Sequence, residues 1–237
     1  MDFLWARDED GLKETAQLVQ DARNSLQQAE NLQIFIQSVD LSESVGYTKK
    51  VDNVLAQWSA QYDTIFLVHN AGALGSLGFA QECPLPSEMA RHFELNVTSV
   101  MWLNKRFLDS EVDYLQRVVE SAIAPYSTLS QYCTAKAARE MHFRVLATEQ
   151  AACNKVRVFS YAPGAMDTEM QQSMRESPLW APELTHWFVK MKEEGALIPI
   201  QQSSQRAVVV AVNGDFESGK YVSFERARYN NLRRVII

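Results

Sequence analysis

Short apolar runs alternate along this chain with longer segments of helical periodicity. The clearest apolar run, Thr64 to Val68, has the uniform character of a strand that is buried on both faces of a parallel sheet. Alternation of such runs with helices predicts an α/β fold with a doubly wound parallel sheet, and 237 residues suit one domain spanning 1–237. The expected strands are Phe3–Ala6, Leu32–Val39, Thr64–Val68, Arg117–Val119, Val156–Tyr161 and Tyr221–Phe224. The expected helices are Gly11–Glu30, one from Ser42 that includes Trp58, Ser87–Phe107, Thr128–Gln150, Pro182–Glu194 and Ser204–Val212.

Composition excludes several classes of partner. The net charge of -6, with 46% apolar and 22% charged residues, is typical of a globular protein and argues against nucleic acid or an anionic membrane. Cysteines are odd in number and irregularly spaced, and the N-terminal segment is acidic rather than basic, so we expect a reducing, cytoplasmic location. The four histidines lack metal-ligand spacing, and we expect no metal. The cysteines are Cys83, Cys133 and Cys153, and the histidines are His69, His92, His142 and His186.

A tyrosine and a lysine lie four residues apart within the expected helix 128–150. In a helix this spacing places Tyr132 and Lys136 on the same face, one turn apart. A nearby cation stabilises phenolate and lowers the tyrosine pKa from about 10. Tyr132 is therefore a candidate general acid that protonates a carbonyl oxygen. The alternative is a surface tyrosine beside a lysine.

Other polar and glycine-containing motifs follow the expected strands. Asn70-Ala71-Gly72 follows the strand at 64–68, Asn96 lies in the next helix, and Pro163-Gly164 follows the strand at 156–161. In an open α/β sheet, ligands bind beyond the carboxyl ends of the strands. We therefore expect these motifs to meet Tyr132 at one crevice.

Together these motifs resemble the short-chain dehydrogenase/reductase family. Within that family, the sequences over 132–139, 161–172 and 216–222 resemble the sepiapterin reductase group. The resemblance implies a Rossmann-like sheet and an NADPH-dependent reduction of a pterin side-chain ketone, as in tetrahydrobiopterin biosynthesis, by a homodimer. Two alternatives are a reductase for another carbonyl compound and a homologue without catalytic activity. The latter would pair with a complete subunit through the helices at 87–107 and 128–150.

The resemblance also implies residue roles. Tyr132 would donate the proton, Lys136 would hold the nicotinamide ribose, and Asn96 would keep the proton-relay helix in shape. Arg7 would pair with the 2′-phosphate of NADP. Each of three residues also has a purely structural explanation. Arg7 would simply be solvated, Asp40 would serve only as an acid at a helix N-terminus, and Asn96 would only satisfy a helix irregularity. The implied cofactor set is Arg7, Asp8, Asp40, Leu41, Asn70, Ala71, Gly72, Tyr132, Lys136, Met166, Asp167, Thr168, Glu169, Met170 and Gln171. The implied substrate set is Ser121, Tyr132, Gly164 and Ser223.

The chain departs from the family pattern in three places. The family's first strand, Gly-rich turn and helix have no counterpart, so the chain would begin one βα unit late. The strands at 3–6 and 64–68 would then either pair directly or leave an apolar groove. Ser121 is the nearest hydroxyl to the position of the family's catalytic serine. Ser223 stands where the group carries a pterin-anchoring aspartate, and Glu225 is expected on the same strand face.

Overall fold

The structure is a computed structural model that describes residues 2–25, 33–56, 64–109, 115–120, 125–152, 156–225 and 227. Two parallel sheets form in these ranges, one with the strand order β1-β2 and one with the order β3-β4-β5-β6. The predicted α/β fold of Rossmann type is confirmed. The strands are β1 (Asp2–Ala6), β2 (Ile34–Ser38), β3 (Ile65–His69), β4 (Leu115–Glu120), β5 (Val156–Ala162) and β6 (Lys220–Ser223).

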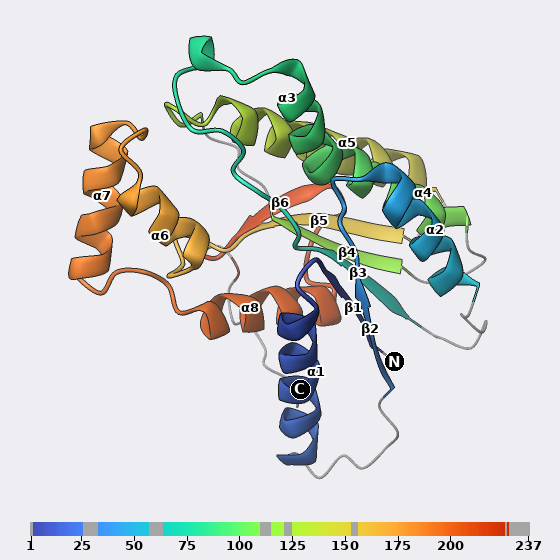
Figure 1. Cartoon of the computed structure of the whole chain (residues 1–237). Helices are drawn as coiled ribbons and strands as arrows, with labels where there is room; N and C mark the ends of the chain where they lie inside the picture. Colours follow the sequence, from blue (N-terminus) through green and yellow to red (C-terminus); the bar gives the residue numbers. More distant parts are fainter. Residues whose placement is uncertain are drawn as a thin grey trace.

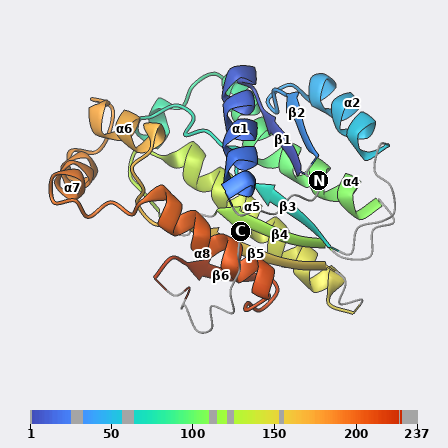
Figure 2. The same ribbon diagram turned by 90° about the horizontal axis from the view of Figure 1, so that it is seen from below.

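Helices cover both faces of the sheets, as a doubly wound fold requires (Figure 1). One face carries α2 to α5, and the other carries α1 and α8, which lie in front of the strands in Figure 2. The helical elements are α1 (Glu9–Ser25), α2 (Ser44–Leu55), η1 (Ala80–Glu82), α3 (Pro86–Phe93), η2 (Glu94–Thr98), α4 (Ser99–Asp109), α5 (Ser130–Gln150), α6 (Glu169–Glu176), α7 (Pro182–Glu193) and α8 (Ile200–Asn213). No helix in these ranges is long and apolar enough to cross a bilayer.

The four-stranded sheet has an apolar layer on each face. On one face, Phe143 of α5 and Val158 of β5 are almost fully buried in a cluster that also includes Phe107 of α4. On the other face, Phe159 and Val210 of α8 belong to a second cluster. The first layer packs the C-terminal half of α5 against the amino half of β5, where Val156 and Val158 lie. Helix α5 is thereby fixed on the sheet, and with it the Tyr132 turn at its N-terminal end.

Three expectations from sequence are wrong in detail. The single helix expected over Ser87–Phe107 is interrupted by the π-helical segment η2. In this segment the helix widens into a π turn, and Asn96 lies at its centre. Helix α6 was not expected, because its sequence EMQQSMRE is almost entirely polar. Strand β6 ends at Ser223, so Glu225 lies beyond the strand and does not share its face by alternation.

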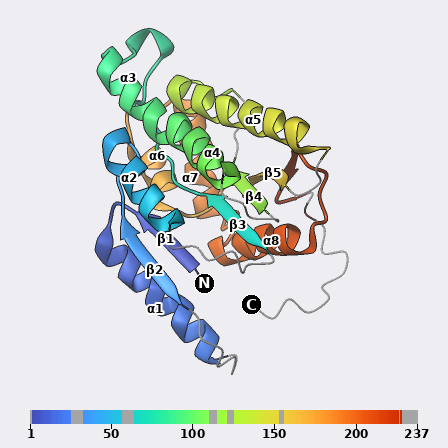
Figure 3. The same ribbon diagram turned by 90° about the vertical axis from the view of Figure 1, so that its right-hand side faces the viewer.

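The two sheets do not join. Strand β1 is hydrogen-bonded only to β2 among the described strands, and β3 only to β4. Of the two outcomes that the sequence allowed, the structure has the groove: residues of β1 and β3 line a cavity of about 1330 Å³. Figure 3 shows β1 and β3 as neighbours with α1 beneath β1 and α4 beyond β3.

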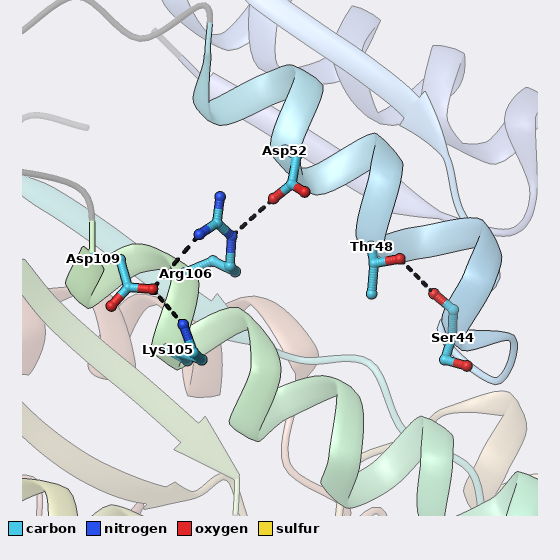
Figure 4. A network of polar contacts seen from close by, with 6 residues as sticks. All are labelled: Ser44, Thr48, Asp52, Lys105, Arg106 and Asp109. Atoms are coloured by element: carbon cyan, nitrogen blue, oxygen red, sulfur yellow. Dashed lines mark hydrogen bonds and ion pairs between the residues drawn. The ribbon is translucent and has the colours of Figure 1, made fainter.

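An ion-pair cluster joins α2 to α4 (Figure 4). Arg106 Nε lies 2.8 Å from Asp52 Oδ1, and a second guanidinium nitrogen lies 3.6 Å from Asp109, which also binds Lys105. Because the carboxylate of Asp52 is 49% exposed, Asp52→Asn should lower the free energy of unfolding by less than about 1 kcal/mol. Urea unfolding measures this change, and a loss above about 2 kcal/mol would contradict a solvent-screened pair.

Candidate active site

Tyr132 and Lys136 lie one turn apart in the first half of α5. Lys136 is only 4% exposed and its Nζ lies 5.4 Å from the centroid of the Tyr132 ring, whereas the tyrosine itself is half-buried. Tyr132 packs against an apolar cluster that contains Leu129, Trp180 and Phe188. The ammonium is thus held inside the fold beside a phenol that solvent and a ligand can reach.

The loop after β3 is held by a buried arginine that the sequence did not single out. Arg139, two turns beyond Tyr132 on α5, is fully buried. Its Nη2 donates to the carbonyl of His69 (2.7 Å), and its Nη1 donates to that of Ala71 (3.1 Å). A guanidinium suits this task because its planar fork carries several donors in fixed directions. The helix that carries Tyr132 is thereby tied to the Asn70–Gly72 loop.

Asn96 holds the same loop from the opposite side. Its Oδ1 accepts the N–H of Ala73 (3.1 Å), and its Nδ2 donates to the carbonyl of His92 (3.0 Å). A Cβ on Gly72 would lie 3.1 Å from Asn96 Oδ1, so glycine allows the close approach. Asn96 is 1% exposed and lies in the π-helical turn of η2. These bonds satisfy the helix irregularity, and a relay role for Asn96 stays a prediction.

His92 connects this polar cluster to the start of α5. Asn96 Nδ2 lies 3.2 Å from His92 Nδ1, and the His92 ring also bonds to the backbone of Gln131, the residue before Tyr132. Burial lowers the pKa of His92 below its usual value, and the bond to Gln131 only partly opposes this effect. The contact between His92 and Gln131 was not predicted from the sequence, because the two residues are far apart in the chain.

The lowered pKa of His92 predicts a pH dependence of stability. Below pH about 6.5 the unfolded chain binds a proton at this histidine while folded His92 stays neutral, so stability falls as the pH drops. The slope from one such group is at most about 1.4 kcal/mol per pH unit. Urea unfolding of wild type and His92→Gln between pH 7.5 and about 5.5 measures it. The variant should show a shallower decline, and equal slopes would exclude His92 as the source.

The residues expected at the adenosine end follow β1 and β2. Arg7 and Asp8 are exposed, and Asp8 Oδ1 accepts the N–H of Asp10 at the start of α1. Asp40 Oδ1 accepts both the hydroxyl and the N–H of Ser42, and these bonds lower the pKa of the Asp40 carboxyl, with a smaller contribution from Arg7. Leu41 is buried against α2. Asp40 therefore stabilises the turn that leads into α2, and its position beside an adenine stays a prediction.

Arg7 and Asp8 lie at the same groove as the loop after β3. Asn70, Ala71 and Gly72 line this groove together with them, so the structure brings these five cofactor candidates to one cavity. Their shared position follows from the parallel strands, whose carboxyl ends meet at one edge.

The residues expected at the nicotinamide end follow β5. Gly164 has φ +80°, a backbone conformation that favours glycine, and a Cβ there would also crowd the end of the Ile198 side chain. Thr168 caps α6 by accepting the N–H of Gln171 (3.2 Å). Asp167 pairs with Lys192 and Arg175, and the hydrogen bond from Lys192 lowers the pKa of its carboxyl. The remaining expected residues are Met166, which bridges to Ile198, and Glu169 and Met170 in the first turn of α6.

Gln171 is an orphaned polar group at this end. It is 3% exposed, and neither polar atom of its carboxamide makes a hydrogen bond to any residue that the structure describes. A buried amide without partners costs free energy unless a ligand satisfies it. Gln171 thus fits a ligand with donor and acceptor groups, such as a nicotinamide carboxamide.

The substrate-side candidates are placed only in part. Ser121 lies outside the described residues. Ser223 ends β6 opposite Ala162 of β5, one residue before Pro163-Gly164, and is half-buried. Within the described ranges, no group of three or more His, Cys, Asp or Glu side chains could hold a metal ion. Instead, His69 and His142 lie on either side of the Asn104 carboxamide, at 3.0 and 3.1 Å.

Comparison with known proteins agrees with this architecture. The family model of the short chain dehydrogenases matches residues 9–179. Sepiapterin reductase of Mus musculus is 33% identical over 207 residues, which cover 83% of this chain and 77% of that protein. Sepiapterin reductase of Bos taurus is 35% identical over 168 residues, which cover 68% of this chain. That match spans 61% of the bovine protein, less than two thirds of its length.

The fold has a solved counterpart in the KRED1-Pglu enzyme. Its crystal structure superimposes with a TM-score of 0.76 at 24% identity, covering 93% of this chain and 88% of that one. Structural similarity at this identity supports the fold, and the sequence matches support the family. The chain therefore belongs to the short-chain dehydrogenase/reductase family, as a sepiapterin-reductase-like member.

Proposed function

We propose that the protein reduces a carbonyl group of a small molecule with NADPH, and that its substrate is a pterin with a side-chain ketone. The observation that carries this proposal is the reachable Tyr132 phenol beside the buried Lys136 ammonium on α5. The similarity to the sepiapterin reductases supports the choice of substrate. Cytoplasmic location and a homodimer belong to the same proposal.

The chemistry assigned to the chain's own residues is a proton transfer. A bound reduced nicotinamide supplies the hydride. Tyr132 donates its hydroxyl proton to the carbonyl oxygen as negative charge develops there. The Lys136 ammonium stabilises the phenolate that is left, because opposite charges attract strongly in a partly buried site. Arg139 and Asn96 act as positioning residues, since each bonds to the loop after β3 and not to a reacting atom.

The residues present fit a nicotinamide dinucleotide at both ends. Gln171 offers an unsatisfied buried carboxamide where the nicotinamide half would lie, and Arg7 offers an exposed guanidinium where the 2′-phosphate would lie. Between these ends, Asn70 to Gly72 would contact the ribose, and Asp40 with Leu41 would border the adenine. The groove between β1 and β3 occupies the middle of this path.

Arg7 should decide between the two nicotinamide cofactors. Because a charge-assisted bond to a phosphate contributes about 1.5–3 kcal/mol, Arg7→Ala should raise the KM for NADPH roughly tenfold or more. The KM for NADH should change little, since NADH has no 2′-phosphate. Steady-state kinetics with each cofactor measures this split. An equal change in both constants would place Arg7 outside the phosphate site.

Two assays test the function as a whole. Direct titration of the protein into NADPH follows the cofactor fluorescence, and incubation with NADPH and sepiapterin follows consumption of both compounds. We expect binding and turnover, and a slower reaction with a simple diketone that lacks the pterin ring. Absence of both binding and turnover would overturn the reductase proposal. Faster turnover of the diketone would favour a reductase for other carbonyl compounds.

The divided sheet favours one second candidate, a homologue that lacks catalytic activity and pairs with a complete subunit. The groove lies where backbone amides of a family member would approach the cofactor's pyrophosphate. Sedimentation of this chain mixed with an active reductase subunit, together with the turnover assay, separates this candidate from the first. If this candidate is right, sedimentation should show a mixed dimer, and this chain alone should show no turnover.

A further inference from the structure

Thr128, four residues before Tyr132, has an unusual backbone conformation. Its φ of +66° lies in the left-handed region, and within the described ranges Thr128 is the one residue other than glycine with a positive φ. This conformation brings Cβ close to the following carbonyl oxygen, and it is especially rare for a β-branched residue. Thr128 is also buried. Residues strained in this way persist where the surrounding structure holds them, and they cluster at functional sites.

Hydrogen bonds to two other segments hold Thr128 in this conformation. Its hydroxyl accepts the backbone N–H of Ala181 (3.3 Å) and donates to the carbonyl of Ser127 (2.6 Å). Its own carbonyl accepts the N–H of Gly78 (3.1 Å), and the next residue, Leu129, forms a parallel bridge with Gly78. Thr128 therefore joins the loop after β3 and the segment that enters α7 to the beginning of α5.

The hydroxyl explains why this position carries threonine. Glycine would adopt the same left-handed conformation without strain. Glycine has no hydroxyl, however, and would leave the buried N–H of Ala181 without its acceptor. The bond between Thr128 and Ala181 is therefore kept at the expense of backbone strain.

The segments that meet at Thr128 also build an apolar wall next to Tyr132. Leu129, Trp180 and Phe188 are buried at its centre, and the Trp180 and Phe188 rings lie edge to face with their centroids 5.7 Å apart. The bond from Thr128 to the N-cap of α7 joins the chain directly beside Leu129 and Trp180. The partly exposed residues that pack against this centre include Leu74, Leu77 and Met174. A ligand at Tyr132 would therefore meet an apolar surface.

Helices α6 and α7 lie together at one end of the molecule, away from α2 and α4 (Figures 1 and 2). The buried bond from Ala181 to Thr128 ties this end to α5. If the acceptor is lost, the N–H of Ala181 stays unsatisfied unless the chain around it shifts. Such a shift would move Trp180 and change the shape of the wall.

We propose that Thr128 is a positioning residue that fixes the apolar wall relative to Tyr132, and with it the fit of a carbonyl substrate that carries a flat ring. This role rests on the proposed reductase function, and it assigns the wall to the part of the substrate beyond the reacting carbonyl. Leucine and methionine side chains suit a flat ring such as that of a pterin, because they pack against its face without needing polar partners.

Substitution separates the hydroxyl of Thr128 from its strained conformation. Thr128→Gly removes both, so the gain from relieved strain opposes the loss of the hydrogen bond, and the midpoint of urea unfolding should stay close to that of the wild type. Thr128→Ser keeps the acceptor and should behave as the wild type in every assay. A loss of function in Thr128→Gly without a loss of stability would not be expected of a residue with only a structural role.

Steady-state kinetics with two substrates tests the positioning role. In Thr128→Gly the KM for sepiapterin should rise about three- to tenfold, the range expected for loss of one hydrogen bond. The KM for a simple diketone without a ring should change less than about twofold, because Tyr132 and Lys136 keep their places on α5. An equal rise for both substrates, or no rise for sepiapterin, would overturn the proposal.

Ala181→Pro breaks the same bond from its donor side. Ala181 has a φ of -58°, which proline adopts, and proline has no N–H. Its rise in the KM for sepiapterin should match that of Thr128→Gly, and the double variant should show no further rise, because both changes remove one bond. Additive effects would contradict a shared bond. This variant also provides the test if Thr128→Gly does not fold.

Hydrogen exchange tests the bond without turnover. Exchange at the Ala181 amide should be at least about tenfold faster in Thr128→Gly than in the wild type, and unchanged in Thr128→Ser. Thr134→Ala is the matched control, since it removes an exposed hydroxyl that donates to the Ser130 carbonyl (2.7 Å) within α5. It should alter neither exchange at Ala181 nor either KM. Unchanged exchange in Thr128→Gly would overturn the proposal.

Failure of this role can be distinguished from failure of the reductase function. If the wild type consumes neither NADPH nor a carbonyl substrate, the reductase function is wrong, and the role of Thr128 is wrong with it. If the wild type is active and Thr128→Gly keeps the wild-type KM for sepiapterin, only the role of Thr128 is wrong.

Discussion

Replacement of Tyr132 by phenylalanine is expected to lower kcat for carbonyl reduction by at least about 100-fold. Phenylalanine keeps the ring that packs against the Leu129, Trp180 and Phe188 cluster but removes the proton that the carbonyl oxygen receives. Because only the reacting group is lost, the dissociation constant for NADPH should change by less than about threefold. Stopped-flow reduction of sepiapterin and NADPH fluorescence titration measure the two quantities separately.

Tyr126→Phe is the matched control, since Tyr126 is 38% exposed and precedes α5. It should leave kcat unchanged. Retention of full activity in Tyr132→Phe would exclude Tyr132 as the proton donor. A loss of NADPH binding as large as the loss of kcat would instead assign Tyr132 to cofactor binding.

Replacement of Arg139 by alanine should give the largest loss of stability among single changes at the site. The change removes one buried and one partly buried hydrogen bond, and it leaves the carbonyls of His69 and Ala71 without these donors. Each unsatisfied buried group costs about 1–3 kcal/mol, partly offset because a charge no longer has to be buried, so we expect a net loss of about 3 kcal/mol. Urea unfolding monitored by circular dichroism measures this loss.

Arg139 should also affect cofactor binding, because it holds the Asn70–Gly72 loop. In protein that is still folded, Arg139→Lys should raise the KM for NADPH more than it lowers kcat, since one ammonium cannot replace the planar fork. Arg144→Ala, an exposed arginine on the same helix, is the control and should cost less than about 0.5 kcal/mol. Equal effects of the Arg139→Ala and Arg144→Ala changes would remove Arg139 from the positioning role.

Much of the fold was predictable because its signals are local. The apolar run at 64–68 became β3, shifted by one residue, and the runs at 3–6 and 156–161 became β1 and β5. A run of β-branched and aromatic residues between helical segments predicts a buried strand without knowledge of its neighbours. Helix α6 was missed because Met170 and Met174 are its only apolar residues, too few to mark a helix face; its local signals are the Thr168 cap, with Glu169 in the first turn and Arg175 in the last.

The sequence predicted only those parts of the candidate site whose residues lie close together in the chain. The spacing from Tyr132 to Lys136 places both on one face of α5, and the structure agrees. The role of Arg139 was not predictable in this way, because its partners His69 and Ala71 precede it by about seventy residues. The same holds for His92, whose contact with Gln131 depends on the packing of α3 against α5.

The sequence by itself determined the order of strands and helices along the chain and the helix face that Tyr132 and Lys136 share. These properties depend on neighbours in the chain and on helical or extended periodicity. Only the tertiary structure decided that β1 and β3 stay apart and that Arg139 and Asn96 hold the loop after β3 from two sides. It also decided that the buried Gln171 carboxamide makes no hydrogen bond to a described residue. The physical reason is that edge pairing and burial depend on how distant segments pack. In this protein, α1 and α4 line the space between β1 and β3 as apolar walls.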